Sequence, residues 1–209
     1  MLILEIYSAR LSHLPDMKLV IASNNQKKRA EIETILGALG IELVAVTQTI
    51  QVDVVEDADS FAGNARKKAE SFVRANGLPA LADDSGLCVD ALRGAPGIYS
   101  SRYAGENASD AANNARLLQQ LHAIDDRRAH FTCALHLAFP DRAPITAEAH
   151  VDGMILLQAV GASGFGYDPL FYCPELGKAF SEASAGEKAG VSHRGRALRA
   201  LARKIQPQM

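Results

Sequence analysis

Two adjacent carboxylates, Asp83 and Asp84, directly follow a short apolar run, Leu78 to Ala82. Ser85 and Gly86 come next, and this composition predicts a tight turn at the carboxyl end of a buried strand. Open α/β sheets bind ligands at that edge. Two acids there need a cationic partner, and Mg²⁺ with phosphate oxygens would provide one. A plain solvated turn is the alternative interpretation.

Lys28 is the first lysine expected to contact such an anion. It follows a predicted strand, Lys18 to Ala22, and lies four residues before Ile32 on the apolar face of a helix predicted to end at Gly40. The free N–H groups and the dipole at a helix N-terminus favour an anion. An ordinary capped helix with a solvated lysine is the alternative.

Lys68 is the second lysine expected to contact the anion. It belongs to another predicted helix, which Ser60 caps and Asn76-Gly77 ends. The apolar face of this helix consists of Phe61, Ala65, Ala69, Phe72 and Val73. Asn64 and Lys68 flank that face, whereas Lys67 is expected to point to solvent. The spacing therefore favours Lys68 as the lysine that reaches a buried anion.

Two glycine-rich loops add aromatic and charged side chains. The first, Gly94 to Tyr103, is as typical of a structural loop as of a binding loop. In the second, Gly161 to Phe171, the glycines allow a close approach to a ligand, and Phe165 or Tyr167 could stack on a base. Asp168 precedes a proline, which favours an extended backbone from which it can meet a donor.

The other predicted elements are a strand over Ile41 to Val46, a helix from Ser109 to about His122, and a hairpin of His130 to Phe139 with Ile145 to Val151. Alternation along the first hairpin strand predicts that His136 is a surface residue. His193 and Arg194 begin a basic final helix, at a position suited to an anion or a base. A plain cap with surface charges is the alternative there.

Composition limits the class of protein. The chain has 209 residues, 48% hydrophobic and 22% charged, with a net charge of −2, which is ordinary for a globular domain. Scattered basic residues disfavour a large nucleic-acid surface. Three widely spaced cysteines without a CxxC pair favour the reducing cytoplasm and disfavour a disulfide framework or zinc site. No stretch approaches the roughly twenty apolar residues of a membrane span.

The order of the motifs carries a resemblance to a known family. SNNQKKRAE, FxxNAxxKA, ADDSGL, GAPGIYSxRY, GFGYDPxF and SHRGxAL follow one another between about Lys18 and Lys204. In this order they closely resemble the Ham1 family of inosine and xanthosine triphosphate pyrophosphatases. Residues 1–16 lie outside the match and are expected to be a leader or an upstream-start extension, and residues 17–209 to form a single domain of two lobes.

The resemblance implies an α/β fold, in which a long mixed central sheet has helices on both sides and two lobes surround a cleft. It implies a cytoplasmic homodimer that uses Mg²⁺ to hydrolyse ITP, dITP and XTP to the monophosphate and pyrophosphate, with no nucleic-acid or membrane partner. A pyrophosphatase of the related Maf type, acting on other modified nucleotides, is the alternative. A nucleotide-binding regulatory module without turnover is disfavoured by the intact Asp84, Lys28 and Lys68.

Site residues follow from the resemblance position by position. Asp84 and Lys68 match catalytic positions, and Asp84 with Glu56 would bind the metal. The chain departs from the family at Val55, where members often carry a second acid. The remaining matches are substrate contacts: Ser23, Asn24, Asn25, Gln26, Lys27, Lys28 and Ser85 near the phosphates, and Phe165, Gly166, Tyr167, Asp168, Lys188, His193 and Arg194 near the base.

Overall fold

The computed structural model describes residues 18–38 and 41–205. The predicted leader and the predicted helix end at Gly40 lie outside these ranges. The chain divides into two compact units. Of the described residues, unit 1 comprises 18–38, 41–84, 134–148 and 197–205, and unit 2 comprises 85–133 and 149–196. Within the described ranges, no helix is long and apolar enough to cross a lipid bilayer.

A mixed sheet of six strands, in the order β1-β2-β3-β4-β5-β6, is the central element. Its strands are β1 (Val20–Ile21), β2 (Ala80–Val89), β3 (Arg128–Ala138), β4 (Ile145–Ile155), β5 (Phe171–Cys173) and β6 (Lys178–Ala179). β1 pairs in parallel with β2, whereas β5 is antiparallel to β4 and to β6. Residues 139–144 join β3 to β4, which confirms the predicted hairpin.

The α-helices of the described chain are α2 (Gln26–Ala38), α3 (Phe61–Asn76), α4 (Asp110–Gln120), α5 (Ala185–Val191) and α6 (His193–Ile205). Short 3₁₀ turns cover Val46–Gln48, Asp90–Leu92, Gly97–Arg102 and Phe180–Glu182. The ends of α3 are as predicted. Ser60 accepts a hydrogen bond from the Gly63 N–H, and Gly77 stops the helix at φ 66°, a conformation that only glycine adopts easily.

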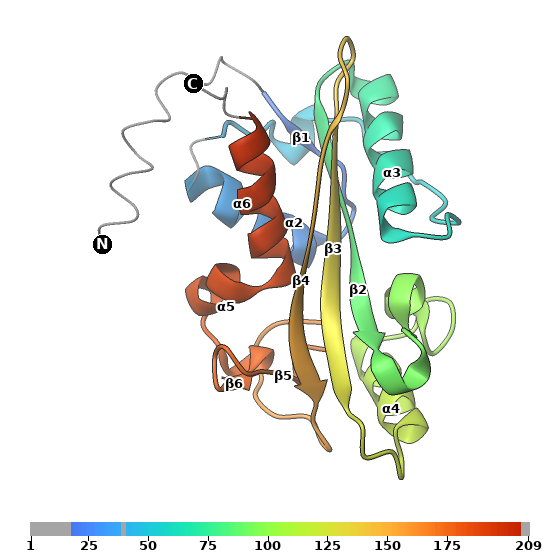
Figure 1. The fold of residues 1–209 in the computed structure, drawn as a ribbon. Coiled ribbons are helices and arrows are strands. Elements are labelled where there is room, and N and C mark those ends of the chain that lie inside the picture. The colour runs from blue at the N-terminus through green and yellow to red at the C-terminus, as the bar shows by residue number, and fades with distance from the viewer. Residues whose placement is uncertain (1–17, 39–40, 206–209) are drawn as a thin grey trace. The chain divides into compact units, whose positions relative to one another are not determined.

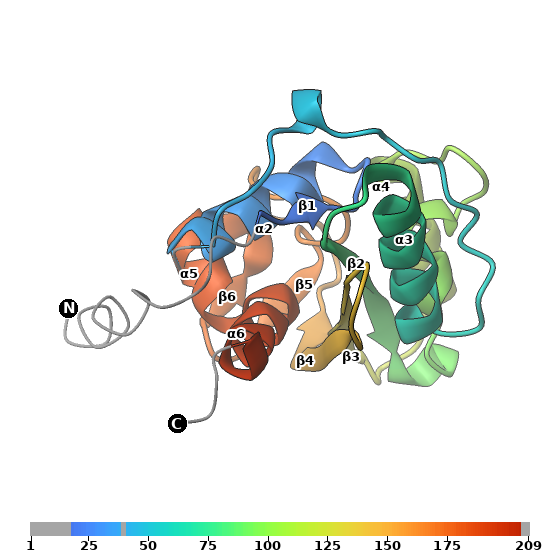
Figure 2. The same ribbon diagram turned by 90° about the horizontal axis from the view of Figure 1, so that it is seen from above.

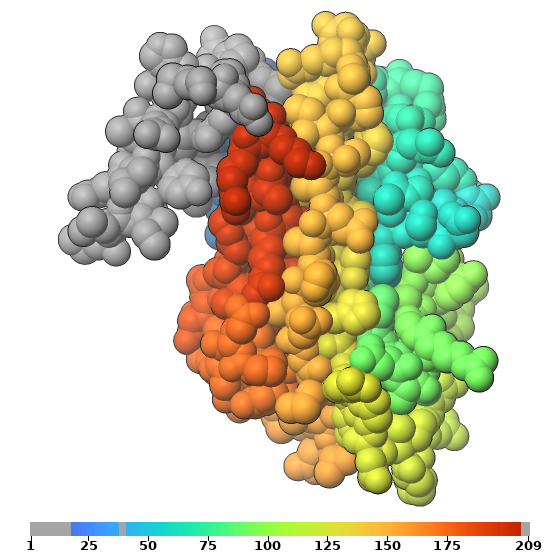
Figure 3. Space-filling view, in the orientation of Figure 1, coloured from blue at the N-terminus to red at the C-terminus, as the bar shows by residue number. Residues whose placement is uncertain are grey.

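The core of unit 1 forms where α3 meets β2. Ala69 and Phe72 of α3 pack on Ala80 and Ala82 of β2, and Figures 1 and 2 show the helix beside the strand. Farther along the chain, the C-terminal part of α6, red in Figure 3, lies against the gold β3–β4 hairpin. There Lys204 Nζ donates to the Thr146 carbonyl at 2.7 Å.

The core of unit 2 is aromatic. Phe131, Phe171 and Phe180 form one buried cluster with Leu87, Leu117 and Val151. The rings of Phe131 and Phe171 lie 4.7 Å apart between centroids, a spacing at which aromatic pairs attract each other. This cluster lies beneath the loop of residues 161–170, since Tyr167 and Leu170 belong to it.

Three predictions from the sequence are wrong. β2 continues through Asp83 to Gly86 as far as Val89 instead of turning. Residues 41–46 contain only a single bridge, between Leu43 and Leu19. His136 is only 7% exposed, because β3 is a central strand with both of its faces buried, and alternation along it does not separate core from solvent.

Candidate active site

The extended backbone at Asp83 and Asp84 determines what these acids contact. Successive side chains of a strand point to opposite faces. Asp83 lies 3.0 Å from Lys28 Nζ, and Asp84 Oδ1 lies 3.2 Å from Lys68 Nζ. Both carboxyl groups are buried. Each acid therefore has its own lysine, one from α2 and the other from α3.

Lys68 is the centre of the group in unit 1. Its ammonium lies 3.1 Å from Glu56 Oε1 and also donates to the Asp83 carbonyl at 2.8 Å. Asn64, one helical turn earlier, donates to Asp84 Oδ2 at 3.2 Å. The apolar face of α3 brings Asn64 and Lys68 to β2, as the sequence predicts.

Burial and charge act in opposite directions on the pKa values of this pair. Burial lowers the pKa of Lys68, but Asp84, Glu56 and Asp83 outweigh that effect and raise it. Burial raises the pKa of the Asp84 carboxyl, although Lys68 and Lys28 oppose the increase. Asp84 is thus a more basic carboxylate than an exposed aspartate, a property suited to accepting a proton.

The segment between β1 and α2 presents backbone N–H groups at a helix N-terminus. Ser23 Oγ accepts a hydrogen bond from the Asn25 N–H at 3.2 Å. Asn25 Oδ1 caps α2, since it accepts from the N–H groups of Lys27 and Lys28 at 3.0 and 3.1 Å. Asn24 donates to the Val52 carbonyl at 3.3 Å. Gln26 and Lys27 are exposed on the first turn of the helix.

Arg29 is a residue of this segment that the sequence reasoning missed. It is 8% exposed, and its Nη2 donates to the carbonyls of Ile21 and Ser23 at 3.2 and 2.7 Å. The guanidinium therefore fixes the backbone on both sides of Ala22. An arginine in a basic run gives no sequence signal for this, because its neighbours Lys27 and Lys28 are equally basic.

Unit 2 contains the other matched residues, which gather around Asp168. Asp168 is 3% exposed. Its Oδ2 accepts hydrogen bonds from the Phe165 N–H at 2.8 Å and from Lys188 Nζ at 2.7 Å. Lys188 Nζ also lies 4.8 Å from the centroid of the Phe165 ring, within the range of a cation–π contact.

The first turn of α6 supplies His193 and Arg194. The Arg194 guanidinium, almost fully buried, donates to Ser85 Oγ at 2.8 Å and lies 5.9 Å from the Phe165 ring centroid. The His193 ring stacks on Phe131 at 4.8 Å. Phe165 thus has cations of two helices, α5 and α6, near its ring.

Tyr167, a matched position, and Val55, a departure from the family pattern, lie away from these groups. Tyr167 is 4% exposed and donates its hydroxyl to the Ser100 carbonyl at 2.9 Å, so its ring packs in the core and only Phe165 of the pair is partly exposed. Val55, the departure from the family pattern, is 73% exposed. Glu56 beside it keeps its carboxylate at Lys68.

Comparison with known proteins identifies the family. The Ham1 family matches residues 19–204. A dITP/XTP pyrophosphatase of Syntrophobacter fumaroxidans is 52% identical over 188 residues, covering 90% of this chain and 81% of the relative. That of Nitrosomonas europaea is 48% identical over 186 residues, covering 88% and 92%. The chain belongs to the Ham1 family.

Solved structures agree in fold. The Staphylococcus aureus Ham1 protein has a TM-score of 0.81 at 41% identity, covering 90% of this chain and 97% of that chain. A nucleoside-triphosphatase, dITP/XTP pyrophosphatase, from Mycobacterium abscessus has a TM-score of 0.71 at 41% identity, covering 88% and 97%. The predicted fold class and the resemblance to the family are both confirmed.

Proposed function

We propose that this protein hydrolyses deaminated purine nucleoside triphosphates, ITP, dITP and XTP, to the monophosphate and pyrophosphate. The observation that carries the proposal is the group in unit 1, where Lys68 joins Asp84 and Glu56. A buried carboxylate of raised pKa beside lysines suits the attack of water on a polyphosphate. The names of the relatives supply the substrate class.

The residues present suit a bound Mg²⁺. The carboxylates of Asp84 and Glu56 both approach one ammonium, so the position already favours a cation. Within the described residues, no three acidic, histidine or cysteine side chains converge, and Mg²⁺ commonly takes one or two carboxylates with substrate phosphates. Asp84 and Glu56 would hold the ion, which when bound neutralises charge on the phosphate oxygens.

In the proposed reaction, Asp84 accepts a proton from a water molecule whose oxygen forms a bond to the α-phosphorus. The bond between that phosphorus and the bridging oxygen breaks, and pyrophosphate leaves. Lys28, Lys68 and the positive end of the α2 dipole stabilise the negative charge on the phosphates. Breaking the α–β bond distinguishes this reaction from that of an ordinary nucleoside triphosphatase, which releases orthophosphate.

Unit 2 would recognise the base. Inosine and xanthine carry a 6-oxo acceptor where adenine has an amine. Lys188, His193 and Arg194 are donors near Phe165 or on the adjoining turn of α6, and Phe165 offers a ring for stacking. Adenine would leave a buried donor unpaired, a mismatch that can cost roughly 10⁴-fold in catalytic efficiency.

The remaining parts of the proposal concern the localisation, the oligomeric state and the partners of the enzyme. We place the enzyme in the cytoplasm as a homodimer without a stable nucleic-acid partner. The three widely spaced cysteines, Cys88, Cys133 and Cys173, support a reducing compartment. The net charge of −2, with scattered basic residues, disfavours a large nucleic-acid surface. Sedimentation of the purified protein measures its oligomeric state directly.

A substrate panel tests the proposed function. The protein is incubated with Mg²⁺ and equal concentrations of ITP, XTP, GTP and ATP, and pyrophosphate and orthophosphate are measured separately. We expect pyrophosphate from ITP and XTP and little from GTP or ATP. Orthophosphate as the main product would contradict the reaction, and equal turnover of ATP would contradict the base recognition.

A further inference from the structure

Two side chains of α4 bond to the backbone of Gly166, one to its N–H and the other to its carbonyl. Its N–H donates to Asp110 Oδ2 at 2.8 Å, and its carbonyl accepts from Asn114 Nδ2 at 3.0 Å. Asp110 and Asn114 are one helical turn apart, so they project from the same face of the helix. The sequence singled out Gly166 but gave α4 no role in the site.

The conformation of this loop requires external support. Gly164 and Gly166 have φ values of 81° and 60°. Glycine can adopt many other backbone conformations as easily, so these two residues would not hold the loop in one conformation without further contacts. Between them, the Phe165 N–H bonds to Asp168 Oδ2, and the Asp168 N–H bonds to the Phe165 carbonyl at 3.2 Å. The contacts from α4 fix the residue immediately after Phe165.

We propose that Asp110 and Asn114 are positioning residues for base recognition, which clamp Gly166 so that Phe165 and Asp168 keep the arrangement that binds the base. The proposal rests on the function proposed above and concerns unit 2 alone. A loop that leaves this arrangement part of the time binds more weakly, in proportion to the fraction of molecules that remain competent. Both residues would act through Gly166, the residue that their hydrogen bonds reach.

Asn114 offers a variant that separates positioning from stability. Its Oδ1 is buried and accepts no hydrogen bond from the described residues. Asn114→Leu removes this unsatisfied oxygen and introduces a better helix former, and both changes favour the folded state. The same substitution removes the donor to Gly166. Stability and base binding should therefore change in different directions.

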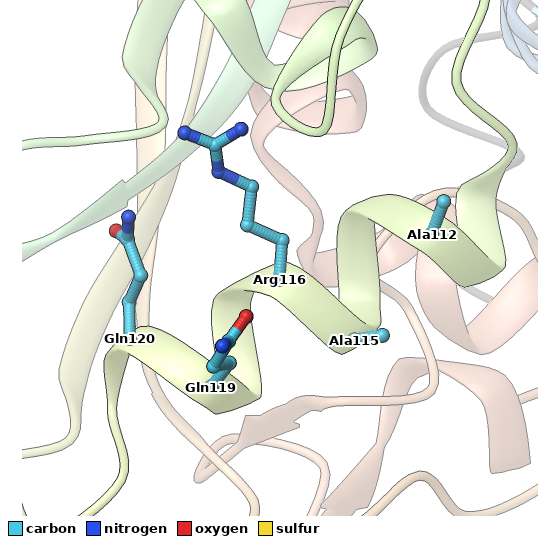
Figure 4. Close-up of a pocket in the computed structure, with 5 residues that line it drawn as sticks. All are labelled: Ala112, Ala115, Arg116, Gln119 and Gln120. Carbon is cyan, nitrogen blue, oxygen red and sulfur yellow. The ribbon is translucent and has the colours of Figure 1, made fainter.

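Gln119 supplies the matched control. It lies on the exposed side of α4, where Ala112, Ala115, Arg116, Gln119 and Gln120 line a surface depression (Figure 4). Gln119→Leu introduces the same side chain into the same helix, away from Gly166. Asp110 has its own conservative control, because Asp110→Asn keeps an oxygen acceptor for the Gly166 N–H and Asp110→Ala removes it.

The experiment measures binding of IMP and of Mg²⁺-pyrophosphate by calorimetry, together with the melting temperature. Since one hydrogen bond contributes about 1 kcal/mol, we expect IMP to bind about fivefold more weakly to Asn114→Leu and to Asp110→Ala. Pyrophosphate affinity should stay at the wild-type value, and the melting temperature of Asn114→Leu should be unchanged or higher. Gln119→Leu and Asp110→Asn should bind IMP as the wild type does.

Three results separate the clamp from the function. If the wild type cleaves ITP and binds IMP, but Asn114→Leu and Asp110→Ala bind IMP equally well, the clamp is wrong and the proposed function stands. The clamp is also wrong if affinity for IMP and pyrophosphate falls together with the melting temperature. A wild type that neither cleaves ITP nor binds IMP would contradict the function, and the clamp with it.

Discussion

The ammonium of Lys68 lies 3.2 Å from Asp84 Oδ1, in contact with a carboxylate that is buried in a central strand. Glu56 approaches the same ammonium at 3.1 Å. A buried ion pair of this kind contributes little to the stability of a fold, since the cost of desolvating the two charges opposes their attraction. Stability alone is therefore a poor explanation for the pair. We regard the pair as a catalytic arrangement in unit 1.

Replacement of Lys68 by methionine should lower kcat for ITP by about 10²-fold or more, because a donor that stabilises charge on the phosphates is removed. Lys67→Met is the matched control. Lys67 pairs with Asp57 at an exposed position, and exposed pairs contribute little to stability. Steady-state kinetics that show equal losses in the two variants would contradict the assignment of Lys68.

Asp84→Asn should lower turnover of ITP by about 10²-fold or more, as loss of a general base typically does. The amide keeps the shape of the side chain and can still accept from Asn64, so the fold should survive. Circular dichroism checks the fold, and pyrophosphate release measures the activity. Activity near that of the wild type would remove Asp84 from the mechanism.

Arg29→Met should weaken binding of Mg²⁺-pyrophosphate by about 10-fold, because the carbonyls of Ile21 and Ser23 lose a charged donor worth about 1.5–3 kcal/mol. Arg74→Met, on the exposed side of α3, controls for the loss of a positive charge. Calorimetry measures both affinities. If the two variants bind pyrophosphate equally, Arg29 has no part in holding this segment.

Gly164→Ala should sharply reduce IMP binding. A Cβ at this residue would lie 2.2 Å from Asp168 Oδ2, at a φ of 81° that already disfavours alanine. Gly177→Ala is matched in backbone, since Gly177 has a φ of 65° but no atom within 4 Å of a Cβ. We expect both variants to lose stability, Gly164→Ala more than Gly177→Ala, and only Gly164→Ala to lose IMP affinity. Equal IMP affinity in the two variants would argue against a role of the Asp168 loop in base binding.

Glu187 should make stability depend on pH at the start of α5, the helix that carries Lys188. Hydrogen bonds from Lys178 and Ser184 lower the pKa of Glu187 from 4.5 to about 2. Because the folded-state pKa is the lower one, the carboxylate stabilises the fold fully above about pH 4.5 and loses this contribution as the pH falls towards about 2.

Melting curves of the wild type and of Glu187→Gln test this dependence. The wild type should melt at the higher temperature at pH 6, and the difference should shrink as the pH is lowered to 3. Glu148→Gln, at an exposed position of β4, controls for removal of one negative charge. A difference that stays constant between pH 6 and pH 3 would contradict the lowered pKa.

Periodicity predicted α2, α3, α4 and α6, because burial and caps act locally, but it missed the short helix α5. Ser60, Gly77 and the inward position of Lys68 all follow from spacing within one helix. The sequence could not predict that β2 runs through Asp83-Asp84-Ser85-Gly86, since these are turn-forming residues. Pairing with neighbouring strands and the lysines at Asp83 and Asp84 overcome that local preference.

The contacts that hold the loops could not be predicted from the sequence either. Arg29 and Asn114 act through hydrogen bonds to backbone carbonyls, and a carbonyl has no sequence signal. Residues 114 and 166 are far apart in the sequence, and only the fold brings them into contact. The family resemblance located Phe165 and Asp168, but the structure was needed to show that Tyr167 packs in the core.

The most direct test of the central claim is to follow the oxygen of the attacking water. ITP mixed with an equal concentration of ATP is hydrolysed in ¹⁸O-labelled water, and both products are analysed by mass spectrometry. Attack at the α-phosphorus of the deaminated nucleotide predicts one labelled oxygen in IMP, unlabelled pyrophosphate and little AMP. Label in pyrophosphate or orthophosphate, or AMP formed as fast as IMP, would contradict the account.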